Sequence, residues 1–334
     1  MTTFEGPNAS VSGGVGSQQE SCCGWGGLVR RHRWLGFVLP FVVYMGVGAF
    51  EPIRPPLKPK PQAILEQGNL PEAGQQAPLA PSAQPTEQLN PSEAGGGEGK
   101  NSAESKESQA APAASPSKTD TLPEANWAGI PYSAYPAVYT LKVLLTCLAI
   151  LLVWPVYREF PCRVSLLAIL VGIGGLIIWL GFSQLNLERK WLEPIGLGAF
   201  VDLGARSGFN PFRVFQEQPV WMLWGFVALR LFGMVIVVAL VEEFFLRGFL
   251  MRYVVQADWW TVPVGRVTLA ALIACVLYAV LSHPAELFGA SVWFLFVTLL
   301  AYKTKNIWDC VVAHATTNAL LGAYILLLSE WKYW

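Results

Sequence analysis

The chain has 334 residues, of which 53% are hydrophobic and 14% are charged, and its formal net charge is zero. Soluble proteins carry roughly 25% charged residues, so this chain is too apolar for an ordinary water-soluble core. The neutral balance lacks the basic footprint of a nucleic-acid-binding protein, and we expect no nucleic-acid partner. The six cysteines show no C-x-x-C spacing, which is typical of small buried hydrophobic residues and not of a zinc site or a disulfide framework.

Residues 1–33 are rich in glycine and serine and end in a basic run, and we expect a disordered cytoplasmic tail. The apolar run 34–50 follows. A cleaved secretory signal is the alternative interpretation, but its amino-terminal region would be unusually long and no A-x-A site ends the run. We therefore interpret 34–50 as a retained first transmembrane helix, although about 17 residues is the short end for a span.

Residues 51–126 are rich in Pro, Gln, Ser, Ala, Gly and Glu and have almost no aromatic or β-branched residues. Such a segment cannot bury enough apolar surface to offset its ordering entropy. The composition predicts a disordered extramembrane linker, acting as a spacer.

Apolar runs return after the linker, and with the first run they predict seven helices. The run 220–256 exceeds the roughly 20 residues that a span needs, so part of it should project from the membrane or lie at its surface. Residues 191–219 contain several prolines and glycines and predict a loop with short interfacial helices. The expected fold is an all-α, polytopic transmembrane bundle of about seven spans, whose later runs are 137–156, 164–185, 220–256, 267–283, 285–302 and 307–328.

Lysine and arginine in short loops predict the orientation. With the N-terminus in the cytoplasm, most basic flanks of the helices fall on the cytoplasmic side, and the short turn after His283 faces outward without a basic residue. The loop that contains Arg189, Lys190, Arg206 and Arg213 is a partial exception. We expect the N-terminus inside the cell and the C-terminus outside.

Ionisable side chains inside apolar helices are expensive and therefore call for a reason. Glu242 and Glu243 are adjacent in an otherwise apolar helix, and Arg247 lies four residues after Glu243 on the same helical face. An ion pair between Glu243 and Arg247 would let both persist in an apolar setting. Glu242 points about 100° away and has no partner in its own helix, which makes it the reactive candidate.

Three further polar residues lie in later apolar helices: His283, which precedes a proline, and His314 with Asn318, which share a face. A carboxylate in an apolar site is a strong base, so Glu242 could take a proton from a water that His283 orients. His314 and Asn318 could donate hydrogen bonds to the developing oxyanion. In simple up-and-down helices these groups would differ in depth by about 10 Å, given a rise of about 1.5 Å per residue.

Other interpretations fit the same residues. One glutamate and two histidines can hold zinc with an open fourth position, although the H-E-x-x-H signature is missing. The Glu243–Arg247 pair, the histidines and Asn318 could serve only to hold helices together. A proton or ion pathway would also concentrate such groups, but the chain shows no inverted repeat.

The six residues resemble the motifs of the CPBP family, which holds the type II CAAX prenyl endopeptidases and their bacterial relatives. The segment from Glu242 to Arg247 matches the motif EExxxR in full, and His314 with Asn318 matches HxxxN. The motif FxxxH is incomplete, because Ala279 precedes His283 by four residues and the aromatic Tyr278 lies one place earlier. The resemblance covers about residues 130–334, and the segment 247–253 with the aromatic ending is similar to the CAAX-protease-related proteins that accompany bacterial exosortase sorting systems.

The resemblance implies a glutamate-type intramembrane endopeptidase in a bacterial inner membrane, with a peptide or protein substrate near the lipid and no cofactor. By motif position, Glu242 would activate water with His283, while His314 and Asn318 would form the oxyanion site and Glu243 and Arg247 would support them. A zinc-dependent mechanism remains the competing proposal. Because the family also holds members proposed as bacteriocin self-immunity proteins, the alternative function is a non-catalytic membrane partner.

Overall fold

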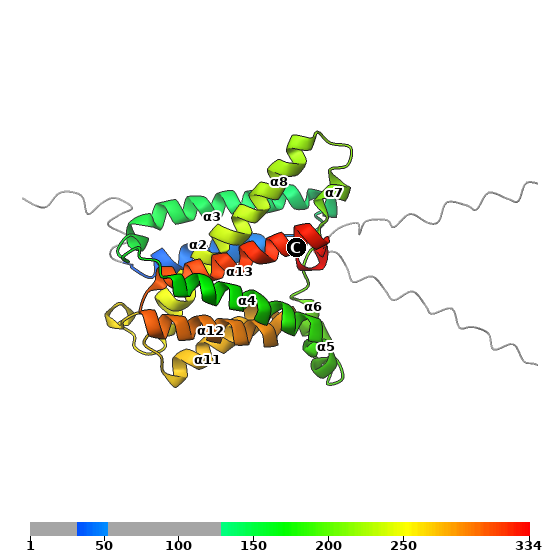
Figure 1. Cartoon of the computed structure of the whole chain (residues 1–334). Coiled ribbons are helices and arrows are strands. Elements are labelled where there is room, and N and C mark those ends of the chain that lie inside the picture. The colour runs from blue at the N-terminus through cyan, green and yellow to red at the C-terminus, as the bar shows by residue number, and fades with distance from the viewer. Residues whose placement is uncertain (1–31, 53–127) are drawn as a thin grey trace, which may run out of the picture. The chain divides into compact units, whose positions relative to one another are not determined.

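The computed structural model describes residues 32–52 and 128–334 (Figure 1). Within these ranges every regular element is a helix and no strand occurs, which confirms the all-α prediction. Almost all of the predicted tail and linker, residues 1–31 and 53–127, lies outside the described residues. The disorder and the domain boundaries expected there remain predictions.

Five helices of the described part are long and apolar enough to cross a membrane. They correspond to five of the seven expected spans. The other two apolar helices, α2 and α11, have 14 residues each, which is about 21 Å of helix against a hydrocarbon core of about 30 Å. The long helices are α3 (Tyr135–Tyr157), α4 (Leu166–Leu185), the continuous helix Val220–Tyr253, α12 (Leu287–Thr304) and α13 (Ile307–Leu328); the short ones are α2 (Leu35–Gly48) and α11 (Leu269–Ser282).

Helix α11 is short for local reasons at both ends. The Thr268 side chain caps its start by accepting a hydrogen bond from the backbone N–H of Ala271. It ends at Ser282 because Pro284 disfavours helical backbone at the residue before it, and His283 accordingly adopts φ −134° and ψ 58°. The helix is therefore shorter than a full membrane thickness.

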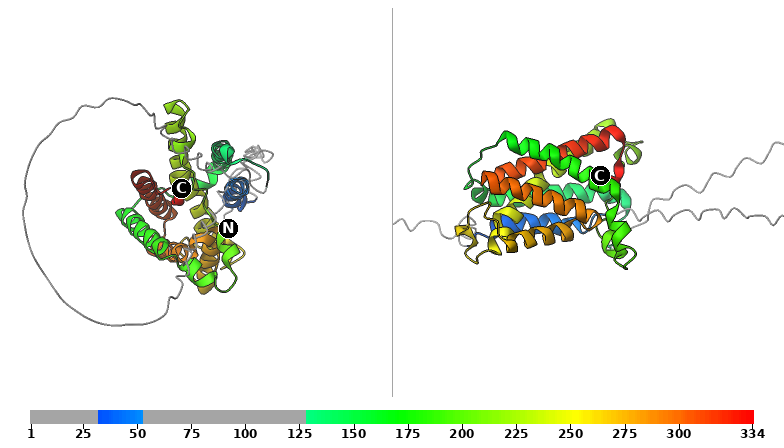
Figure 2. Two further views of the ribbon diagram at one scale, coloured as in Figure 1. Left: turned by 90° about the vertical axis from the view of Figure 1, so that its right-hand side faces the viewer. Right: turned by 60° about the horizontal axis from the view of Figure 1, so that its bottom comes forward.

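The helix Val220–Tyr253 is continuous but irregular. It comprises α8 (Val220–Phe232), the π-helical η2 (Gly233–Val237), α9 (Val238–Glu243), the π-helical η3 (Phe244–Leu250) and α10 (Met251–Tyr253). Helix α8 diverges from the neighbouring helices in both Figure 1 and Figure 2. π-helical turns are frequent at functional sites, and here they flank the segment that carries Glu242 and Glu243.

Short helices fill the loop between α4 and α8, as the sequence predicts. They are α5 (Leu187–Leu192), α6 (Gly198–Asp202) and α7 (Pro211–Val214). Single 3₁₀ turns complete the described chain at η1 (Tyr132–Ala134), η4 (Trp259–Thr261), η5 (Pro284–Glu286) and η6 (Trp331–Tyr333).

Small residues set how closely α4 packs on its neighbours. Helix α4 lies beside α13 and α12, and α2 lies beside α3 (Figure 2). A side chain at Gly175 of α4 would collide with Trp293 of α12 and Thr317 of α13. Glycine at this position therefore lets three helices meet behind the residues described below, as small residues do in membrane bundles.

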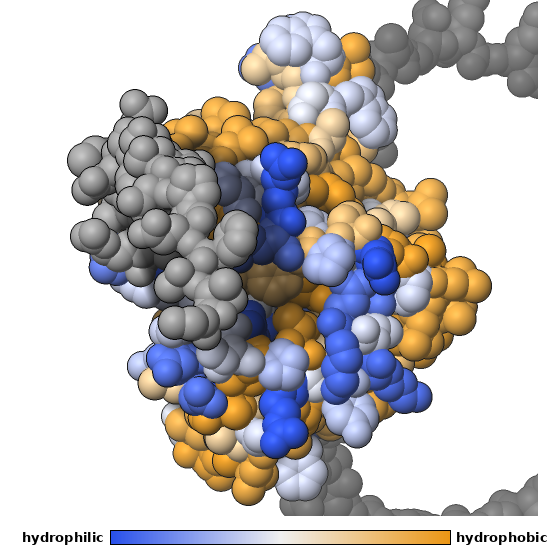
Figure 3. All heavy atoms as spheres, turned by 90° about the vertical axis from the view of Figure 1, so that its left-hand side faces the viewer, coloured by the Kyte–Doolittle hydropathy of each residue, from blue (hydrophilic) through white to orange (hydrophobic). Residues whose placement is uncertain are grey.

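Basic residues gather at the end of the bundle where α2 begins. Arg158, Arg163, Arg266 and Lys305 are exposed in the loops at this end, and Lys303 is exposed in the last turn of α12. Figure 3 shows hydrophilic residues on this face, with apolar side chains around them. The sides of α3 and α4 expose many leucines and isoleucines, as expected of surfaces that face lipid.

Candidate active site

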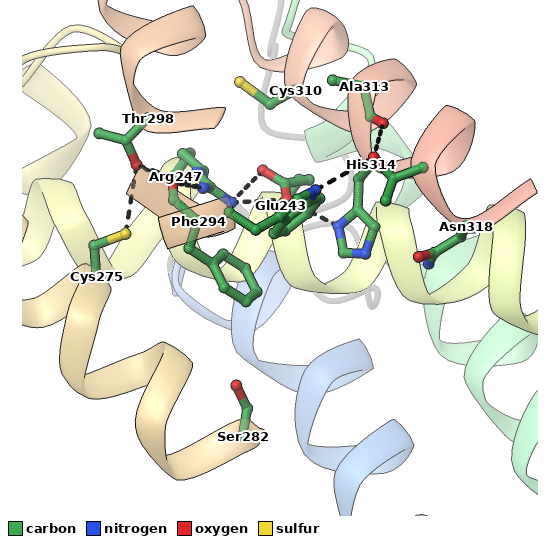
Figure 4. A network of polar contacts seen from close by, with 12 residues as sticks. Glu243, Arg247, Cys275, Ser282, Phe294, Thr298, Cys310, Ala313, His314 and Asn318 are labelled. Atoms are coloured by element: carbon green, nitrogen blue, oxygen red, sulfur yellow. Dashed lines mark hydrogen bonds and ion pairs between the residues drawn. The ribbon is translucent and has the colours of Figure 1, made fainter. Parts of the chain in front are cut away.

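Glu243 and Arg247 form a buried ion pair within the long helix. Arg247 Nη1 donates to both Glu243 carboxylate oxygens, at 2.7 and 2.6 Å, and neither side chain is more than 2% exposed. Arg247 Nη2 also donates to the Phe294 carbonyl of α12 at 2.7 Å (Figure 4). The pair that the four-residue spacing predicts thus forms, and it joins the long helix to α12.

Glu242 has different surroundings, because successive helical residues point about 100° apart. Its carboxylate lies beside the His314 ring and the Tyr278 hydroxyl, and its side chain is buried. One carboxylate oxygen, Oε2, is buried without any hydrogen-bond partner among the described residues. Such a group is costly unless something binds it, so it is available to a molecule that enters the site.

A cavity of about 240 Å³ lies next to Glu242. Four predicted residues line it: Glu242 from α9, His283 from the end of α11, and His314 and Asn318 from α13. The tertiary structure therefore brings together side chains that are up to 76 residues apart in the chain. The other polar residues of its wall are Tyr44, Arg206, Arg230, Ser282, Glu286 and Thr317.

His283 is held by a short chain of hydrogen bonds. The Ser282 hydroxyl donates its single hydrogen to the Tyr278 carbonyl at 2.7 Å, so it can only accept from His283 Nδ1, which lies 2.8 Å away. Nδ1 thus carries a proton, and in the neutral ring Nε2 is the acceptor that a water can use. The rings of Trp179 and Phe294 pack against the imidazole, with centroids at 5.5 and 5.6 Å.

His314 is tied to the ion pair, a contact that the sequence does not predict. Its Nδ1 lies 3.0 Å from Glu243 Oε1. Because a carboxylate only accepts hydrogen bonds, Nδ1 donates and Nε2 is the ring nitrogen that is left for the cavity. Trp293 packs edge-on against the ring at 4.6 Å between centroids. Glu243 therefore fixes the orientation of the His314 ring, in the way that a carboxylate orients the histidine of a catalytic triad.

Asn318 lies on the same face of α13 as His314 and also contacts the long helix. Its Nδ2 donates to the Met234 carbonyl of η2 at 2.7 Å. An amide nitrogen carries two hydrogens, so one N–H is used in this contact and the second is left. Asn318 thus joins two helices and retains one donor.

The donor set fits a metal ion poorly. Glu242, His283 and His314 share one cavity, but the described residues contain no group of three His, Cys, Asp or Glu side chains placed to bind one ion.

Several cavity residues escape the sequence analysis. Arg230 is an ionisable residue inside the apolar run of α8, so the rule that singles out the glutamates applies to it as well. Arg206 lies in the loop and pairs with Glu286 at 2.8 Å. Ser282 is next to His283 in the sequence, and its hydroxyl contacts near neighbours in the chain, His283 Nδ1 and the Tyr278 carbonyl.

A comparison with models of known protein families relates part of the chain to one of them. Residues 223–320 match the family described as type II CAAX prenyl endopeptidase Rce1-like. This range runs from α8 into α13 and includes all six residues proposed from sequence. The match agrees with the resemblance to the CPBP family; it does not extend to the exosortase-associated subgroup. No curated protein and no solved structure is significantly similar to the chain.

Proposed function

From the premise that this chain is a membrane protein with a region of the Rce1-like family of CAAX prenyl endopeptidases, we propose that it hydrolyses a peptide bond of a membrane-associated protein substrate, with Glu242 as the base that activates water. One observation carries the proposal. The Glu242 carboxylate is buried and has an unpartnered oxygen at a cavity that His283, His314 and Asn318 also line. Structural helix contacts alone would leave no reason for an unpaired buried carboxylate.

In this mechanism a water molecule lies between Glu242 and Nε2 of His283. The carboxylate removes a proton as the water oxygen attacks the peptide carbonyl, and His283 holds the water in line. The oxyanion accepts hydrogen bonds from the free N–H of Asn318 and from Nε2 of His314, which donates only when the ring is doubly protonated. Glu242 then returns its proton to the leaving amine as the carbon–nitrogen bond breaks.

The Glu243–Arg247 pair has a positioning role in this proposal. It fixes His314 through Nδ1, and it fixes α9 against α12 through the Phe294 carbonyl. A site that is held in this way loses little free energy to reorganisation when charge develops.

We also propose a bacterial inner membrane with the N-terminus in the cytoplasm. Support comes from the exposed basic residues at the end where α2 begins, since lysine and arginine favour cytoplasmic loops. In this orientation the cavity, with Arg206 and Glu286 in its wall, lies towards the outer side. A substrate linked to an exosortase-type sorting system remains a proposal that rests on sequence similarity alone.

The test replaces Glu242 with glutamine, which keeps the size and removes the base. Purified wild type and Glu242→Gln are reconstituted in liposomes with a pool of S-farnesylated peptides, in which the three residues after the modified cysteine are randomised. Mass spectrometry follows the cleaved ends. We expect a loss of about 10²–10⁴-fold in rate for Glu242→Gln, with wild-type activity in the exposed control Glu193→Gln.

Normal cleavage by Glu242→Gln would refute the assignment of the base. If the wild type cleaves nothing while Glu242→Gln loses a cellular immunity phenotype, the chain is a non-catalytic partner.

A further inference from the structure

Arg206 and Glu286 form an ion pair between two short segments at the end of the bundle where α5 and α6 lie (Figure 1). Arg206 Nε donates to Glu286 Oε1 at 2.8 Å, and the side chains are 25% and 14% exposed. Arg206 follows α6, and Glu286 belongs to η5, the single turn that begins directly after His283. The two segments touch closely, because a side chain at Gly204 would collide with the backbone nitrogen of Ala285. The pair therefore bridges the loop and the turn beside His283.

A second cavity borders the same ion pair. Its volume is about 320 Å³, and the described residues that it shares with the cavity beside Glu242 are Arg206 and Glu286. We call it the outer pocket, and the cavity beside Glu242 the inner cavity. The wall of the outer pocket contains exposed polar and charged residues, namely Gln184, Asn186, Arg189 and Lys332. The ion pair thus stands between a pocket that faces water and the candidate active site.

The inner cavity is largely covered by protein. Among its described wall residues only Met45 of α2 is exposed, and this apolar side chain suits contact with lipid better than with water. Hydrolysis of a peptide bond consumes a water molecule, so the site also needs a polar route. The outer pocket suits water, because Ser183 Oγ in its wall is buried without a hydrogen-bond partner among the described residues.

We propose that the outer pocket is the entrance for the water consumed in hydrolysis, and that the Arg206–Glu286 pair is the gate between this pocket and the inner cavity. The inference rests on the proposed function, because it assigns the source of the attacking water. A partly exposed ion pair is weak and opens readily, since water competes for both groups. Opening does not strand the guanidinium, because Arg206 Nη1 also donates to the Tyr333 carbonyl at 3.3 Å.

The position of Arg206 connects the gate to His283. The guanidinium lies over the Trp179 ring, 5.6 Å from its centroid, and the same ring packs against the His283 imidazole at 5.5 Å between centroids. A water molecule that passes the pair therefore arrives next to the imidazole whose Nε2 accepts its hydrogen bond in the proposed mechanism. The two reactants then have separate routes, with the peptide approaching from the lipid beside Met45 and water from the outer pocket.

The test measures how fast a small reagent dissolved in water reaches the inner cavity, which needs no catalysis. Purified protein in nanodiscs is treated with diethyl pyrocarbonate, and mass spectrometry follows the modification of each histidine. The chain has three histidines, and the exposed His32 serves as the internal standard for His283 and His314. Cleavage of the farnesylated peptide pool is measured in parallel. The variants are Arg206→Gln, Glu286→Gln, the combination of these two changes, and Arg206→Lys.

Arg189→Gln is the matched control. Arg189 also lines the outer pocket and also forms an ion pair, with Asp202 at 2.8 Å, but it does not line the inner cavity. We expect each neutralising variant to speed the modification of His283 by about two- to fivefold, the range for loss of a partly exposed ion pair. The double variant should be no faster than either single one, because both changes remove the same contact. Arg206→Lys keeps the charge, so it should stay closer to the wild-type rate, as should the control.

The possible failures can be told apart. Wild-type rates of modification in both neutralising variants overturn the gate, and so does an equal acceleration in Arg189→Gln, which would reflect a general loosening of the loop. Loss of cleavage at an unchanged rate of modification would assign the pair to holding η5 in place, and would also overturn the inference. The expected pattern of modification in a wild type that cleaves no peptide leaves the gate intact and overturns the peptidase. Melting temperatures identify a variant that fails to fold, in which case the other neutralising variant decides.

Discussion

Replacing Glu243 and Glu242 separately with glutamine should have opposite effects on stability, although the two residues are adjacent. Glu243 is fully buried and accepts hydrogen bonds from Arg247 Nη1 and His314 Nδ1. Glu243→Gln leaves the Arg247 charge buried without a counter-charge and points an N–H₂ group towards other donors. Breaking one partner of a buried pair costs about 3–5 kcal/mol. Glu242→Gln removes a buried carboxylate that has no ion-pair partner, so it should be neutral or stabilising.

The assay is thermal unfolding of both variants in detergent micelles, followed by intrinsic fluorescence. A change of 1 kcal/mol shifts the midpoint by about 2–4 °C for a domain of this size, so Glu243→Gln should melt about 6–20 °C below wild type. Glu242→Gln should melt at or above the wild-type temperature. The double change Glu243→Gln with Arg247→Met removes both charges and should recover much of the loss, because the penalty comes from the unpaired charge.

Loss of activity should not follow loss of stability in these variants. Glu242→Gln should be folded and inactive, whereas the double variant should be folded and impaired because His314 has lost its charged acceptor. Melting temperatures of the two single variants within about 2 °C of each other would refute the ion-pair argument, since that difference corresponds to less than about 1 kcal/mol.

Two further predictions concern packing and the linker. Gly175→Ala should destabilise the bundle by about 1–3 kcal/mol, because the added methyl group meets Trp293 and Thr317. Gly181 on the same helix has open space around it, so the control Gly181→Ala should be neutral or slightly stabilising. Equal melting temperatures of the two variants would contradict the close approach of α4 to α12 and α13. Deleting residues 55–120 should leave the melting temperature and the peptidase activity unchanged, because this segment lacks apolar residues for a core and because α2 and α3 contact each other directly. A loss of many degrees would show that the linker packs on the bundle.

The sequence by itself determines the local features of this protein. Apolar runs predict the positions of the helices closely, since a helix in lipid must satisfy its own backbone and present apolar side chains. The four-residue spacing predicts the Glu243–Arg247 pair and places His314 beside Asn318, because helical geometry is independent of the rest of the fold. Pro284 predicts a break after His283 in the same way.

Only the tertiary structure decides what these local features meet. Local signals end α11 at Ser282, but the placement of that end beside the cavity depends on how α11 packs on α12. The contact of His314 with Glu243 joins residues 71 apart, and the tie of Asn318 to Met234 joins residues 84 apart. Arg230 is informative for the same reason: an arginine in an apolar run predicts a partner, and only the packing of the neighbouring helices shows that its guanidinium lies over the Tyr139 ring. Contacts between distant segments depend on helix crossings that no local pattern encodes, and these crossings decide which buried charges are neutralised inside the protein and which are left for a ligand.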